Sequence, residues 1–193
     1  MESPRYTTIA RLLHWMIALM AIGQFWLGWW MQSLPKAPPG ARAEAFNLHK
    51  SIGLTILGLM VLRMLWRARV RPPPGLPAAA WKGALARANH AALYAILITL
   101  PISGYLGSVF SGYPVKLFGF TLPSWGTALP AAKDFMGVVH LGAAWVLAAA
   151  LALHLAGAIH HAVTTGDSVL GRMGWGRSRR RVTAALPEAP PLP

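Results

Sequence analysis

The chain has 193 residues, of which 55% are hydrophobic and 12% are charged, and because an ordinary soluble domain is about 25% charged, this composition favours a membrane protein. Its 18 Lys and Arg residues outnumber 5 Asp and Glu residues, and the net charge of +13 indicates either nucleic-acid binding or cations gathered on one side of a membrane. The chain has no cysteine, which excludes disulfides, iron–sulfur clusters, thiolate zinc sites and covalently attached haem, and leaves histidine as the strongest metal ligand.

Four apolar stretches predict an all-α fold, an integral membrane four-helix bundle. The expected spans are about 9–31, 47–67, 88–110 and 135–164. Thr7 and Thr8 are candidate N-caps of the first span, which is too long for a signal peptide and ends before Pro35. Pro101 is expected to kink the third span. Each span is long enough to cross a hydrocarbon core of about 30 Å.

The distribution of cations predicts the orientation. The two termini and the second connection hold 13 of the 18 cations, and the first and third connections hold the remaining five. The positive-inside rule then places both termini in the cytoplasm of a bacterium, with the bundle in the inner membrane. The cations that raised nucleic-acid binding are explained in this way, so no nucleic-acid partner is expected. Residues 1–171 form the predicted membrane domain, and 172–193 form a basic, proline-rich cytoplasmic tail expected to be disordered.

Four histidines pair by their depth in the membrane. His140 and His154 lie on one face of the fourth span, about 21 Å apart along its axis. His14 lies near the cytoplasmic start of the first span, at the depth of His154, and His49 lies at the outer start of the second span, at the depth of His140. The sequence therefore predicts an inner pair, His14 with His154, and an outer pair, His49 with His140.

Two facing imidazoles without a nearby Cys, Asp or Glu make a poor zinc site, because zinc prefers four ligands. They are the two axial ligands that a six-coordinate haem b requires, and small residues such as Gly53 and Gly142 let a flat ring approach the helices. We therefore predict two haem b groups, with His14, His49, His140 and His154 as the iron ligands.

The other histidines are more ambiguous. His90, His160 and His161 lie near the inner ends of the third and fourth spans. One interpretation is that they hydrogen-bond or protonate a quinone headgroup beside the inner haem, with Arg11 or Arg87 contacting a haem propionate. The other is that they are interfacial residues that meet lipid phosphates or carbonyls at helix ends.

Several motifs together resemble the bacterial cytochrome b561 family, in its four-helix, di-haem form. The matching segments are Leu13-His14-Trp15, 47–53, 61–64, 89–94, 100–104, His140, His154 and 160–161. They cover nearly the whole chain. The resemblance implies the same two haem pairs and electron transfer between the periplasmic surface and the quinone pool.

The resemblance also implies an activity, since well-characterised relatives of this type are superoxide oxidases. Superoxide would give an electron to the outer haem, and the electron would reach ubiquinone. Lys50, Lys116 and Lys133 could attract the superoxide anion, although solvated surface lysines would look the same. An alternative function is a non-catalytic cytochrome b subunit that links a periplasmic dehydrogenase or hydrogenase to quinone. A third is a lipid- or ion-handling protein whose histidines are structural.

Overall fold

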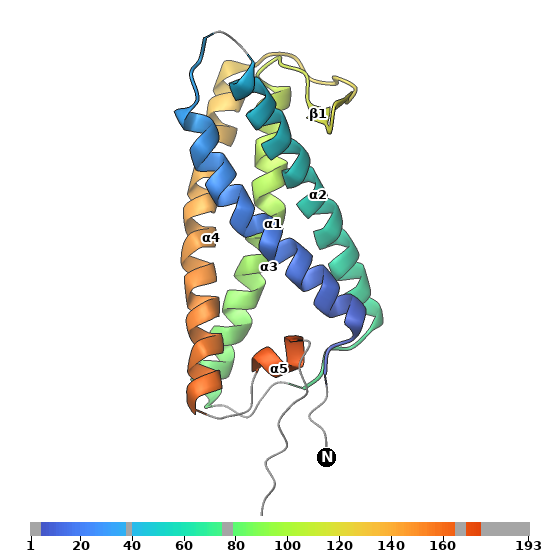
Figure 1. Ribbon diagram of the computed structural model, residues 1–193, viewed down its shortest axis with the longest axis vertical. Coiled ribbons are helices and arrows are strands. Elements are labelled where there is room, and N and C mark those ends of the chain that lie inside the picture. Colours follow the sequence, from blue (N-terminus) through green and yellow to red (C-terminus); the bar gives the residue numbers. More distant parts are fainter. Residues whose placement is uncertain (1–4, 38–39, 75–78, 165–168, 175–193) are drawn as a thin grey trace, which may run out of the picture.

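The computed structural model describes residues 5–37, 40–74, 79–164 and 169–174. Four long helices run alongside one another in alternating directions (Figure 1). They are α1 (Thr8–Ser33), α2 (Ala41–Arg69), α3 (Ala80–Val109) and α4 (Pro130–Thr164). All four are long and apolar enough to cross a membrane, which confirms the predicted four-helix membrane bundle.

The helices begin earlier than the hydrophobic stretches predict. α2 begins at Ala41 rather than 47, α3 at Ala80 rather than 88, and α4 at Pro130 rather than 135. The predictions followed apolar side chains, whereas helical hydrogen bonding continues into polar turns that do not need to enter the hydrocarbon. Thr7 is the N-cap of α1, because its hydroxyl accepts a hydrogen bond from the amide of Ala10 at 3.3 Å.

The two ends of the bundle differ in what covers them. At one end, which we call the hairpin end, strands β1 (Lys116–Leu117) and β2 (Phe120–Thr121) form an antiparallel hairpin that packs on α2. Its turn has positive φ at both Phe118 and Gly119, as tight β-hairpins favour. The hydroxyl of Ser51 accepts a hydrogen bond from the Phe118 amide at 2.9 Å, which ties the hairpin to α2.

The opposite end, which we call the terminal end, lies where α1 begins and α4 finishes (Figure 1). A short helix, α5 (Val169–Met173), packs there against α4. Arg172 was expected to begin a disordered tail, but it belongs to α5 and is buried. Its guanidinium donates to the carbonyl of Pro74 at 2.9 Å, which accounts for its order. Residues 175–193 of the expected tail lie outside the described residues.

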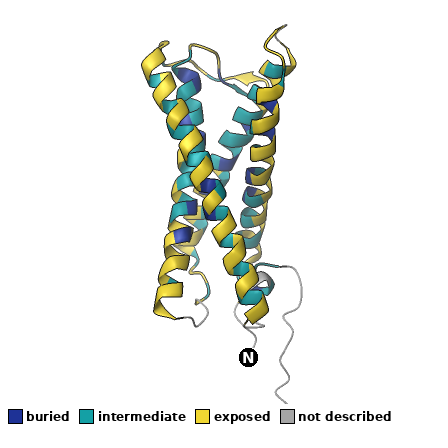
Figure 2. Cartoon of the chain, turned by 90° about the vertical axis from the view of Figure 1, so that its left-hand side faces the viewer, coloured by how far each residue is buried: buried dark blue, intermediate teal, exposed yellow. Residues whose placement is uncertain are grey.

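The bundle has a thin core and an apolar exterior. One core cluster joins α1 and α2 through Ile17, Ile56 and Met60, and a second joins α3 and α4 through Leu93 and Leu147. Most residues on the outside of the helices are exposed (Figure 2). Many of these exposed residues are large and apolar. Such a surface is unfavourable in water and suits contact with lipid tails.

Neighbouring helices pack in chain order. α1 packs against α2, α2 against α3, and α3 against α4. Neither α1 nor α2 packs closely on α4 within the described part of the chain. The histidines of α4 therefore face α1 and α2 across less closely packed parts of the bundle.

Candidate functional site

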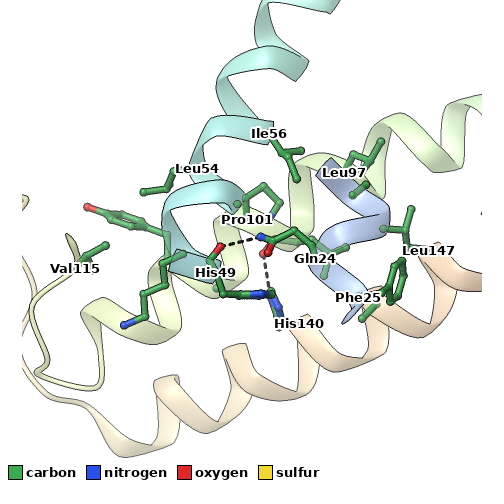
Figure 3. A pocket seen from close by; sticks show the side chains of 17 residues that line it. Gln24, Phe25, His49, Leu54, Ile56, Leu97, Pro101, Val115, His140 and Leu147 are labelled. Atoms are coloured by element: carbon green, nitrogen blue, oxygen red, sulfur yellow. Dashed lines mark hydrogen bonds between the residues drawn. The ribbon is translucent and has the colours of Figure 1, made fainter. Parts of the chain in front are cut away.

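At the hairpin end, the structure brings His49 of α2 beside His140 of α4. Their ring centres are 6.1 Å apart and their planes differ by 71°. Both rings line a largely apolar cavity whose walls include Phe25, Leu54 and Leu147 (Figure 3). The site is therefore two imidazoles in a nonpolar setting, drawn from helices that do not pack closely on each other.

A hydrogen bond to α3 fixes the orientation of His140. Its Nδ1 lies 2.9 Å from the carbonyl oxygen of Leu100 and 3.2 Å from the hydroxyl of Ser103. A carbonyl oxygen only accepts, so Nδ1 carries the proton in this bond and Nε2 keeps its lone pair for a ligand. Metal-binding histidines commonly have such a second partner.

His49 is held by its backbone, not by its ring. Its carbonyl accepts a hydrogen bond from Nε2 of Gln24 at 2.7 Å (Figure 3). Nδ1 of His49 and Oε1 of Gln24 are buried without a hydrogen-bond partner among the described residues. Buried polar atoms rarely go unsatisfied in folded proteins, so this end of the bundle is suited to a polar or metal-containing group that supplies the missing interactions.

Two glycines make room for the rings at this end. A Cβ atom on Gly104 would lie 3.1 Å from Cε1 of His140, and one on Gly28 would lie 3.4 Å from Cε1 of His49. A side chain at Gly104 would be closer than most real contacts. The glycine therefore allows the imidazole of His140 to lie directly against α3.

At the terminal end, three histidine rings meet. His14 of α1 and His154 of α4 have ring centres 6.3 Å apart, and His90 of α3 lies 5.3 Å from His154. The charge of Arg63 lies close enough to interact electrostatically with all three rings. Its Nε donates to the hydroxyl of Tyr94 at 3.0 Å and its Nη1 to the carbonyl of Ala10 at 3.0 Å.

The ring spacings fit a shared metal ion. Two imidazoles that bind one metal, each through a bond of about 2 Å, have ring centres roughly 6 Å apart. The His49–His140 and His14–His154 pairs, at 6.1 Å and 6.3 Å, both meet this spacing. Within the described ranges, no group of three or more His, Cys, Asp or Glu side chains could hold a bare metal ion. The residues present therefore fit a haem, whose porphyrin supplies the other ligands.

The remaining residues predicted for the terminal end do not gather at one point. Arg11 donates from Nη1 to the carbonyl of Gly174 at 2.8 Å, so it faces the C-terminal segment. His160 stacks edge-on with His161 and lies 3.4 Å from the ammonium of Lys82. Arg87 is exposed near the start of α3. Of these histidines, His90 alone has a ring contact with His14 or His154 in the described part of the chain.

The three predicted lysines are also placed differently from one another. Lys50 lines the cavity beside His49. Lys116 is in β1, and its carbonyl accepts a hydrogen bond from Ser51 at 3.2 Å. Both are thus near the same turn of α2. Lys133 pairs instead with its neighbour Asp134 in the first turns of α4, at 3.4 Å.

Sequence reasoning missed two polar residues of the sites. Arg63 falls within the motif segment 61–64 but was assigned no role at either site, whereas the structure holds it among α1, α2 and α3. Gln24 was not singled out, although it is a polar residue inside an otherwise apolar span. An isolated polar or charged residue in a membrane helix is itself a signal of function, and this signal could have identified both.

The fold and the two histidine pairs define a class: multi-pass membrane proteins whose helices enclose paired imidazoles. The sequence profile of the family described as Prokaryotic cytochrome b561 matches residues 5–176. The chain therefore belongs to the prokaryotic cytochrome b561 family. This membership makes it a bacterial membrane cytochrome b that carries haem b and transfers electrons.

Two relatives match over most of their length. One, "Cytochrome b561 homolog 2" from Escherichia coli (strain K12), is 39% identical over 172 residues, 88% of this chain and 90% of the relative. The other, "Probable superoxide oxidase CybB" from Yersinia pestis, is 28% identical over 172 residues, 88% of this chain and 96% of the relative.

Proposed function

We propose that this chain binds two haem b groups, one at each end of the bundle, and passes electrons between the end that faces the periplasm and quinone. His49 and His140 would hold the outer haem, and His14 and His154 the inner one. The observation that carries the proposal is the presence of two imidazole pairs, at 6.1 Å and 6.3 Å, at opposite ends of four membrane-crossing helices.

Each bound haem would supply a reversible one-electron couple at its iron. The protein's part is to hold and tune that couple. The bond from His140 to Leu100 keeps one ring nitrogen free for the iron. The largely apolar cavity wall gives the outer site a nonpolar setting, and Arg63 adds a positive charge beside the inner one.

We further propose that both termini face the cytoplasm, as the distribution of cations predicts. The inner haem then lies at the terminal end, where quinone is reduced. Reduction of a quinone to a quinol consumes two electrons and two protons. His90, which lies beside His154, and His161 are the residues proposed to hydrogen-bond the quinone or deliver protons. Arg11 and Arg87 remain the proposed contacts of the haem propionates.

We propose superoxide as the electron donor and ubiquinone as the acceptor. Two superoxide anions would each lose one electron to give O2, and one ubiquinone would take up both electrons and two protons. The name of the Yersinia pestis relative supports this donor. So does the position of Lys50 and Lys116, two cations near the outer histidines, because a local positive field attracts an anion.

The first experiment is an optical spectrum of the purified protein with a haem-to-protein ratio. Two haem b groups per chain with bis-histidine spectra are expected. One haem, or none, would contradict the proposal. A colourless protein would favour the structural interpretation of the histidines.

The second experiment tests the donor. Superoxide generated enzymatically should reduce the haem faster than the uncatalysed background, and ubiquinone should reoxidise it. Replacing Lys50 and Lys116 together by Gln should slow reduction several-fold and weaken its dependence on salt. Lys36→Gln is a control for the loss of one cation elsewhere on the outer side, because Lys36 lies between α1 and α2 and does not line the cavity. Equal rates of haem reduction in the wild type and all variants would show that the two lysines do not guide superoxide. Reduction no faster than background, together with co-purification of a soluble redox protein, would favour the electron-transfer subunit instead.

A further inference from the structure

A cleft rich in arginine lies at the terminal end, between the start of α1 and the end of α2. Four arginines line it: Arg5 before α1, and Arg63, Arg67 and Arg71 of α2 and the segment after it. Aromatic and apolar side chains complete its walls, among them Trp66 and Tyr94. This mixture of cations and apolar surface differs from the cavity at the hairpin end, where apolar groups dominate.

Two of the arginines lie one helical turn apart on α2 and contact the same tyrosine. The guanidinium carbons of Arg63 and Arg67 each lie 5.8 Å from the ring centre of Tyr94. Arg63 is further anchored to the Tyr94 hydroxyl and to the carbonyl of Ala10. Like charges one helical turn apart repel each other, so the arrangement favours an anion between or beside them.

The described part of the chain provides no such anion. Its two carboxylates, Glu44 and Asp134, both lie at the hairpin end, in the first turns of α2 and α4. The C-terminal dipole of α2 offers about half a negative charge near its last turn. That is too little to neutralise the guanidinium groups of Arg63, Arg67 and Arg71.

We propose that this cleft binds the phosphate of an anionic phospholipid headgroup. Guanidinium groups recognise phosphate through paired, charge-assisted hydrogen bonds. The cleft lies where α2 ends after crossing the membrane, at the level expected for headgroups. Its apolar wall is also anchored to α1, because Nε1 of Trp66 donates to the hydroxyl of Thr7 at 3.0 Å. A bound lipid would thus join the start of α1 to the end of α2.

The test is native mass spectrometry of the full-length, haem-loaded protein with phosphatidylglycerol or with net-neutral phosphatidylcholine. The wild type should retain phosphatidylglycerol in preference to phosphatidylcholine. The double substitution Arg67→Gln and Arg71→Gln should weaken that retention by about tenfold. Arg69→Gln with Lys82→Gln is the matched control, because it removes the same charge at the same end and neither residue lines the cleft. The haem-to-protein ratio is measured for every variant.

Each outcome decides the proposal. The proposal is supported if the variant with Arg67→Gln and Arg71→Gln, the cleft variant, loses phosphatidylglycerol while the control variant keeps it, with unchanged haem content in both. Equal loss of phosphatidylglycerol in the control variant would mean that only the net charge of this end matters, and would overturn the proposal. Loss of haem in the cleft variant would identify the anion as a haem propionate and would also overturn it. Displacement of the lipid by millimolar inorganic phosphate would identify free phosphate as the ligand of the cleft and would overturn the proposal, whereas retention of the lipid supports it.

Discussion

The two ends of the bundle hold similar histidine pairs in different ways. At the hairpin end, a backbone carbonyl of α3 orients His140, and a hairpin tied down by Ser51 covers the end. At the terminal end, no side-chain hydrogen bond to the imidazole of His154 occurs in the described part of the chain, but the ring contacts His90 and lies within reach of the charge of Arg63.

One fold can therefore give its two sites distinct properties. A carbonyl that accepts the Nδ1 proton increases the electron density of the imidazole, whereas a nearby guanidinium favours the more reduced, less positive state of a metal. An electron would therefore be drawn toward the terminal end. This direction agrees with the proposed transfer from the periplasmic side to quinone.

The largest effect should come from removing a ligand at one end. His140→Ala is expected to reduce the haem content from two per chain to one, because the outer pair loses half of its axial ligands. His154→Ala should likewise remove the inner haem and leave the outer one. The haem-to-protein ratio and the spectrum of the haem that remains distinguish the two variants. His160→Ala, an exposed histidine of α4, is the control and should keep both haems. Loss of both haems in either ligand variant would show that the two sites do not assemble independently.

A smaller effect should follow from filling the space beside His140. The substitution Gly104→Val places carbon atoms where the ring of His140 now lies, since even a Cβ would be 3.1 Å from Cε1. Forcing extra atoms into a packed site costs about 1–3 kcal/mol, so haem at the hairpin end should be bound more weakly. A titration of apoprotein with haem measures this. Gly23→Val is the control, because a Cβ at Gly23 would have no atom within 4 Å, and this variant should bind haem normally. Equally weakened haem binding in the Gly23→Val variant would mean that valine acts by destabilising the helix in general.

The sequence predicted the features of the two ends that depend on position along a helix, namely which histidines lie at each end. The spacing of His140 and His154 on one apolar span fixes their face and depth, so the structure's placement of each beside its expected neighbour follows from helical geometry. The bond from His140 to Leu100 depends instead on how α3 packs against α4. Arg63 illustrates the same limit, because the sequence shows a cation near a membrane surface but not which helices it joins.

The hairpin offers a third test. Ser51 is almost fully buried, and its hydroxyl both donates to the carbonyl of Asn47 at 2.8 Å and accepts from the amide of Phe118. Ser51→Ala leaves that amide without its partner, which costs about 1–2 kcal/mol. Hydrogen exchange in residues 115–121 should become faster, while the terminal end stays protected. Thr99→Ala removes an exposed hydroxyl that bonds only within its own helix, and exchange in the hairpin should not change.

The smallest effect should be at the terminal end, where Arg63→Gln removes a positive charge but keeps a hydrogen-bonding side chain. Loss of the charge favours the oxidised, more positive iron, so the potential of the inner haem should fall. An interaction of roughly 1 kcal/mol corresponds to about 40 mV for one electron. A spectroelectrochemical titration should show this fall for one haem and an unchanged potential for the other. Arg69→Gln, at an exposed position of the same helix, should leave both unchanged. A shift of equal size in both haems would mean that Arg63 acts on the whole bundle, and the electrostatic difference between the two ends would then need another cause.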